Sequence, residues 1–126
     1  MITVAAIAIL AAIALPIYSN YVIRGKLTEA FNTLTAYSTA LSQYYQDNRT
    51  YVGGCTANPP ASPNFTYSCT LSATAYTLTA VGAATGQLNG FSYTLTDSGA
   101  RATIAAPTGW ATNTTCWVNS KSGACQ

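Results

Sequence analysis

The hydrophobic positions of this chain change their pattern near residue 23. From Met1 to Ile23 there is no charged residue, and the run MITVAAIAILAAIALPI is almost wholly aliphatic. Further along, apolar residues recur at steps of three and four, which predicts an amphipathic helix over residues 24–51 with one face on a folded partner. Together the two segments predict one helix from near Met1 to about Tyr51, about 75 Å long. The positions expected to pack this helix on a sheet are Leu27, Phe31, Leu34 and Leu41.

Three interpretations compete for the apolar segment, residues 1–23. A signal peptide normally opens with basic residues, and no Lys or Arg precedes this run. A plain membrane anchor fits, because about 20 apolar residues span the hydrocarbon of a bilayer. The many alanines favour an anchor that also packs against copies of itself, because small residues let helices approach closely. The expected membrane or filament-core residues are Val4, Ile7, Ala8, Ile9, Ala11, Ala12, Ile13 and Leu15.

Pro16 lies inside this apolar run. A proline cannot donate a hydrogen bond to the carbonyl four residues earlier, here that of Ala12, and its ring crowds that carbonyl. We therefore expect a helix break at Pro16, as a kink or a short melted stretch just before it.

The rest of the chain predicts a small sheet. Residues 52–65 are rich in Gly, Pro, Ser and Asn, which is typical of a loop. Four runs with alternating apolar and polar residues follow within about 66–106, namely FTYSCTLS, AYTLTAV, FSYTLT and ARATIAA. The expected fold class is α+β, in which the long helix packs on a small antiparallel sheet. We therefore expect an apolar helix segment at 1–23 and a globular domain at 24–126, whose tail at 107–126 is irregular.

The four cysteines indicate disulfides. None of them has C-x-x-C spacing, and the chain has no His to complete a metal site. Disulfides place the domain in an oxidising compartment. Of the three possible pairings we prefer the local ones, Cys55–Cys69 and Cys116–Cys125, because each closes a loop with little other structure; pairings that cross between the two loops remain open.

The composition argues against an enzyme. Histidine, the commonest general base, is absent, and the carboxylates Glu29, Asp47 and Asp97 are scattered over three segments. No phosphate-binding glycine motif occurs. We expect no catalytic residue, no metal, no cofactor and no small-molecule substrate. Charged residues make up only 6% of the chain and the net charge is +2, too weak to indicate nucleic acid by bulk electrostatics.

The run MITVAAIAILAAIALPIYSNYV, with its proline followed by Tyr-x-x-Tyr and a basic residue, resembles the N-terminal helix of type IV pilins. This resemblance covers the first quarter of the chain and implies a four-stranded sheet and a disulfide-closed C-terminal region, to which Cys116–Cys125 would correspond. The family's leader peptide, N-methylated first residue and near-terminal glutamate are missing from the sequence. We therefore expect the sequence to begin inside the mature helix.

The resemblance implies a major, type IVa-like subunit that polymerises with copies of itself into an extracellular pilus for twitching motility, adhesion or DNA uptake. Before assembly it would wait in the inner membrane and meet the pilus assembly machinery. A minor pilin and a type II secretion pseudopilin are alternatives; the latter is disfavoured because calcium needs carboxylates. A single-pass membrane protein with a periplasmic binding domain is the alternative from another class. DNA binding has weak support; its candidate residues are Arg49, Arg101, Lys121, Trp110 and Trp117.

Overall fold

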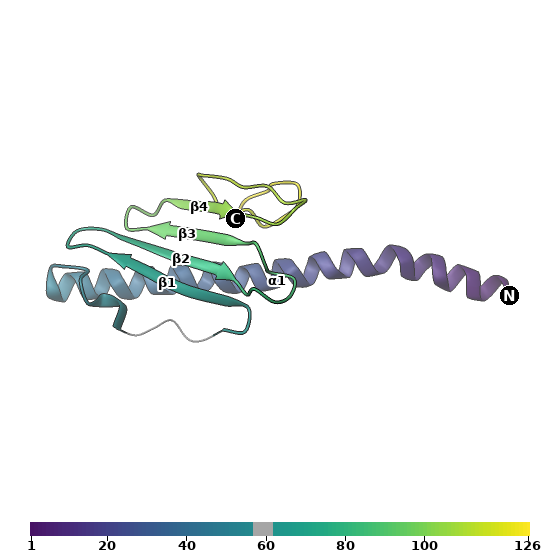
Figure 1. Ribbon diagram of the computed structural model, residues 1–126, viewed down its shortest axis with the longest axis horizontal. Coiled ribbons are helices and arrows are strands. Elements are labelled where there is room, and N and C mark those ends of the chain that lie inside the picture. The colour runs from purple at the N-terminus through teal and green to yellow at the C-terminus, as the bar shows by residue number, and fades with distance from the viewer. Residues whose placement is uncertain (57–61) are drawn as a thin grey trace.

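A computed structural model describes residues 1–56 and 62–126 of the chain. It consists of one long helix, a sheet that lies against the second half of that helix, and a C-terminal region beyond the last strand (Figure 1). The first half of the helix projects away from the sheet, so that the N-terminus lies far from the rest of the molecule (Figure 1). The loop expected at residues 52–65 falls partly outside the described residues.

Helix α1 runs from Ile2 to Asn48. It ends at Arg49, which adopts a left-handed conformation (φ 59°) and donates its N–H to the Tyr45 carbonyl over 2.8 Å. The expected end at Tyr51 was therefore about one turn too late. A left-handed residue at the cap closes the last turn, and neither a Gly nor an Asn signals this cap in the sequence.

Residues on both sides of Pro16 are helical in the single chain, so the helix is not melted there. A proline removes one hydrogen bond of a helix, while the neighbouring residues keep theirs. The expected kink at Pro16 stays a prediction. The state of this segment in an assembled fibre stays a prediction.

The sheet has four antiparallel strands in the order β1-β2-β3-β4. A short 3₁₀ turn, η1 (Gly54–Thr56), lies between α1 and the sheet. The four alternating runs of the sequence correspond to the four strands, and the expected α+β fold class is confirmed. The strands are β1 (Phe65–Leu71), β2 (Tyr76–Gly82), β3 (Ser92–Thr96) and β4 (Arg101–Ala105).

The core lies between one face of the sheet and the second half of α1. Leu27, Phe31, Leu34 and Leu41, the helix positions expected to pack on a sheet, are all buried there. Phe31 stands at its centre, because its ring stacks on Trp117 (centroids 5.0 Å apart) and meets Tyr93 edge-on at 4.9 Å. The other buried apolar side chains come from the strands and loops: Phe65, Tyr76, Leu78, Ala80, Leu88, Phe91, Leu95 and Val118.

Candidate functional site

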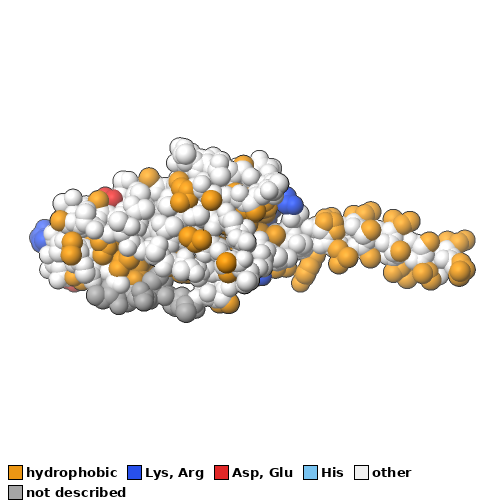
Figure 2. Space-filling view, viewed as in Figure 1, with side chains coloured by type: hydrophobic (Ala, Val, Ile, Leu, Met, Phe, Trp, Pro, Cys, Tyr) orange, Lys and Arg blue, Asp and Glu red, His pale blue; other side chains and the backbone are white. Residues whose placement is uncertain are grey.

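The apolar segment at the start of α1 is uncovered in the single chain. From Met1 to Tyr18 its large side chains are at least 56% exposed, and apolar atoms dominate this part of the surface (Figure 2). By length and composition, α1 is the one helix among the described residues that could cross a membrane, with a mean hydropathy of 2.3 over its most apolar window. The eight residues expected to form a membrane or filament-core surface all lie here and are all exposed.

Both local cysteine pairs are bonded in the structure, Cys55–Cys69 and Cys116–Cys125. The first joins the loop after α1 to strand β1. The second closes nine residues within the C-terminal region, and Val118 also forms a β-bridge with Cys125. Consequently the two segments with the least regular structure are each held by a covalent bond.

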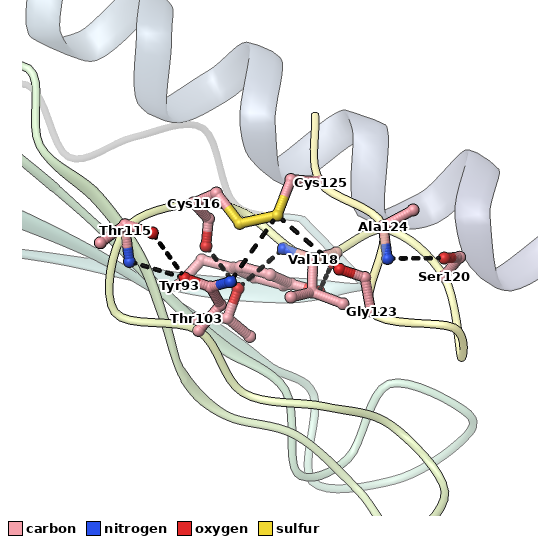
Figure 3. The surroundings of a disulfide bond; sticks show 10 residues. Tyr93, Thr103, Thr115, Cys116, Val118, Ser120, Gly123, Ala124 and Cys125 are labelled. Atoms are coloured by element: carbon pink, nitrogen blue, oxygen red, sulfur yellow. Dashed lines mark hydrogen bonds between the residues drawn. A yellow bond between two sulfur atoms is a disulfide. The ribbon is translucent and has the colours of Figure 1, made fainter.

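Three hydrogen bonds, two of them buried and one part-buried, dock the C-terminal region on the sheet (Figure 3). Thr103 of β4 donates its hydroxyl to the Cys116 carbonyl over 3.0 Å and accepts the Val118 N–H over 2.8 Å. The Tyr93 hydroxyl donates to the Val118 carbonyl over 2.9 Å. Val118 is 1% exposed and its contact with Thr103 is buried, so the Val118 N–H depends on the Thr103 hydroxyl for its hydrogen bond.

Trp117 contributes to the core and not to a binding surface. It is 1% exposed, and its indole N–H donates to the Thr94 carbonyl over 2.8 Å. Trp110 is partly buried against the edge of Phe91. The weakly supported DNA candidate Trp117 is therefore not available for stacking, because its faces are occupied by Phe31 and by a cation.

That cation is Arg101, whose guanidinium lies 4.4 Å from the centre of the Trp117 ring. Arg101 is exposed, and no described carboxylate pairs with it. From residue 98 to the end the sequence holds Arg101 and Lys121 and no acidic residue. The third DNA candidate cation, Arg49, lies apart from them at the C-terminal end of α1.

Glu29 has a role that sequence reasoning missed. Its carboxylate accepts hydrogen bonds from the Ser62 hydroxyl and from the Asn64 amide, the latter over 2.7 Å. It thereby holds the start of β1 on the helix. A lone glutamate on a helix gives no signal for partners more than 30 residues away.

No catalytic arrangement emerges from the described residues. Among residues 1–56 and 62–126 no group of three or more His, Cys, Asp or Glu side chains could hold a metal ion. Burial raises the pKa of the Tyr93 phenol and of the Tyr67 phenol, so both stay neutral near pH 7. The features left for function are the apolar segment, the cations Arg101 of β4 and Lys121 of the C-terminal region, and the solvent face of the sheet.

Comparison with known proteins decides the family. Residues 16–117 match the family described as "Type IV minor pilin ComP, DNA uptake sequence receptor". This chain belongs to that minor pilin family. Type IV pilins are structural proteins and not enzymes, which agrees with the expectation that this chain is not an enzyme.

Two curated fimbrial proteins resemble the N-terminal part. Fimbrial protein EcpC of Eikenella corrodens is 53% identical over 47 residues, or 37% of this chain, and a fimbrial protein of Moraxella nonliquefaciens is 43% identical over 54 residues, or 43% of this chain. The matched segments span only 31% and 35% of those relatives' lengths. These matches agree with the pilin-like N-terminal helix quoted from the sequence.

A solved structure shares the fold. The minor pilin PilV of Neisseria meningitidis aligns with a TM-score of 0.62 and 22% identity, covering 71% of this chain and 93% of PilV. The resemblance to type IV pilins is therefore confirmed. The family match supports the alternative, a minor pilin, better than the expected major subunit.

Proposed function

We propose that the protein is a minor subunit of a type IV pilus, which the apolar segment of α1 anchors in the inner membrane and later holds among other pilins in the filament. The observation that carries the proposal is the contrast between the two halves of α1. The second half buries one face under the sheet, whereas residues 1–18 expose their aliphatic side chains. An uncovered apolar surface of this size needs lipid or protein around it.

The same surface suits both environments. Lipid tails and neighbouring apolar helices are about equally apolar, so transfer from membrane to filament depends on close packing of the helices. The side chains of Ala8, Ala11 and Ala12 keep the helix narrow at this point. Such a subunit enters and leaves a filament without exposing the segment to water.

Cell fractionation separates this proposal from an anchored receptor. Pili are sheared from cells and sedimented, and the chain is quantified in the pellet and in the envelope by immunoblot. A pilus subunit is expected in the sheared pellet together with the other pilins. If the chain stays in the envelope of piliated cells, the proposal is wrong.

A second role, contact with DNA during uptake, is favoured by the cations Arg101 of β4 and Lys121 of the C-terminal region. The matching family is described as a DNA uptake sequence receptor. In this chain Arg101 is exposed, carries no described ion pair and is oriented by Trp117. A guanidinium held in this way is suited to a phosphate group, because little side-chain freedom is lost when it binds.

The DNA role predicts a weak and measurable electrostatic signature. Each phosphate neutralised by a cation contributes about −0.9 to the slope of log K against log salt. In fluorescence anisotropy with duplex DNA and the full chain in nonionic detergent, the Arg101→Ala, Lys121→Ala double variant should lose up to about two such contacts. Arg49→Ala is the single-charge control and should keep the parent slope. An unchanged slope in the double variant would exclude the C-terminal region as the DNA site.

A further inference from the structure

The solvent face of the sheet carries a regular array of hydroxyl groups. The strand register places Thr70, Thr77 and Thr96 side by side in one row across β1, β2 and β3. Ser68, Thr79 and Thr94 form the next row. Neighbouring strands lie about 4.8 Å apart and successive outward residues of one strand about 7 Å apart, so six hydroxyls form a grid, here called the hydroxyl face.

These hydroxyls differ from those on the outer side of α1. The helix hydroxyls of Thr28, Thr35, Thr39 and Ser42 each donate to the carbonyl four residues earlier. In the hydroxyl face only Thr96 has a side-chain hydrogen bond among the described residues, to Ser98. The other five hydroxyls keep their donors and acceptors for solvent or a ligand.

Charge is missing from the hydroxyl face. The outward positions of β1, β2 and β3 hold Thr, Ser and Val, and none is ionisable. Figure 2 shows the same, since the blue and red side chains lie toward the margins of this view. Solvated sheet faces and edges commonly carry Lys and Glu, which resist association with other chains. A neutral face with free hydroxyls instead matches a neutral, hydroxyl-rich ligand, and it offers no cation to a nucleic acid phosphate.

A hollow of about 150 Å³ lies at the end of the first row. Thr70, Leu71, Ser72, Ala75, Tyr76 and Thr77 line it, and among their hydroxyls that of Ser72 is hydrogen-bonded to the Ala75 backbone and that of Tyr76 to Ser38. This volume is below the usual range for drug-sized ligands, so it suits a single small ring. A mixture of hydroxyl and apolar lining fits a sugar ring, which has polar edges and apolar faces.

We propose that the hydroxyl face binds a neutral polysaccharide, with one sugar unit in the hollow beside Thr77 and the chain running along the row toward Thr96. A flexible glycan can follow the twist of the sheet, about 20–25° per strand. A rigid crystalline surface would lose contact after one or two strands. This site lies on a different surface from the cations of the proposed DNA role, and the proposal depends on neither that role nor filament assembly.

Sugar binding by the full chain in nonionic detergent tests the proposal. The probes are the hexamers of N-acetylglucosamine, β-linked glucose and α-linked glucose, measured by calorimetry at 50 and 500 mM salt. We expect binding of at least one hexamer with the same affinity at both salt concentrations, because no charge takes part. The triple variant Thr77→Val, Thr79→Val, Thr94→Val keeps the side-chain shape and strand preference while removing three hydroxyls. It should lower the affinity at least tenfold without lowering the melting temperature.

The matched control is Thr28→Val, Thr39→Val, which removes two hydroxyls that are already satisfied within α1 and should leave sugar binding unchanged. Failure of all three hexamers to bind would overturn the proposal, as would equal affinity of the parent and the triple variant. If the triple variant instead reduces co-sedimentation of the chain with sheared pili, the face is a contact between subunits and the proposal is wrong. DNA binding is measured in parallel and should be unchanged by the triple variant.

Discussion

Replacing Thr103 by Val should release the C-terminal region from the sheet. The Thr103 hydroxyl donates to the Cys116 carbonyl and accepts the Val118 N–H, at 3.0 and 2.8 Å, in a site that is 1% exposed. Valine fills the same space but leaves both backbone groups without a partner. An unsatisfied buried polar group costs about 1–3 kcal/mol, so the two together should cost about 2–4 kcal/mol after the gain from the extra methyl group. For a domain of this size that lowers the melting temperature by on the order of 10 °C or more.

Two readouts follow this change. Thermal unfolding is monitored by tryptophan fluorescence in nonionic detergent, because Trp117 is buried only while the C-terminal region is docked. Hydrogen exchange at the Val118 amide reports local release of the region, which the disulfide still tethers. Both should shift in the Thr103→Val variant.

The matched control is Thr94→Val, which removes the same group from the solvent face of the adjacent strand. Among residues 1–56 and 62–126 the Thr94 side chain has no hydrogen-bond partner, so its replacement should change the free energy of unfolding by no more than about 0.5 kcal/mol. Equal effects of the two substitutions, with Val118 still protected from exchange, would refute the reasoning that buried hydrogen bonds dock the C-terminal region.

Three further predictions concern other parts of the chain. Non-reducing peptide mapping should find Cys116 linked to Cys125, and removal of this bond should cost on the order of 3 kcal/mol; a peptide that joins either cysteine to the other pair would contradict the fold. In the folded state burial holds the pKa of the Tyr93 phenol above its ordinary value of 10.0, so the neutral phenol stabilises the fold fully below about pH 10 and this stabilisation is lost as the pH rises further. The melting temperature of the Tyr93→Phe variant should therefore fall less steeply with alkaline pH than that of the parent. Equal slopes of melting temperature against pH in the two proteins would contradict this. In the assembled filament the backbone hydrogen bonds of α1 just before Pro16 should be stretched or broken, because the Ala12 carbonyl has no N–H partner at Pro16. Electron cryomicroscopy of the filament that showed an ideal α-helix there would refute this.

Much of the fold could be predicted because its signals are local. The apolar run, the steps of three and four residues in the second half of α1, and the strict alternation in the four strands each follow from nearby residues. The positions Leu27, Phe31, Leu34 and Leu41 were assigned to the core from their spacing alone, and all of them are buried.

The remaining features depend on contacts between distant segments, which a periodic pattern does not encode. Trp117 looked like a possible DNA-stacking residue because the sequence does not reveal that Phe31, more than 80 positions earlier, covers its ring. Nothing in the sequence distinguishes Thr103 from the other threonines of the strands, although its hydroxyl bonds two backbone groups of the C-terminal region. Likewise, no residue pattern in the single sequence distinguished a minor pilin from a major one.

The central claim is that the apolar segment of α1 places this minor pilin in a filament. Its most direct test is the amount of the chain in sheared pili when Ala12 is replaced by Asp. A charge at the centre of an apolar helix costs about 3 kcal/mol in a membrane, and an uncompensated charge between packed helices costs 3–5 kcal/mol. The long apolar run should still hold the variant in the envelope, whereas packing among other pilins should fail.

The control is Ala73→Asp, which adds the same charge at an exposed position in the turn between β1 and β2. Quantitative mass spectrometry of sheared pili and of envelopes then compares the parent with both variants. The account predicts that the parent and Ala73→Asp are present in the pili, while Ala12→Asp is at least tenfold depleted there and remains in the envelope. Equal amounts of Ala12→Asp and the parent in purified pili would contradict it.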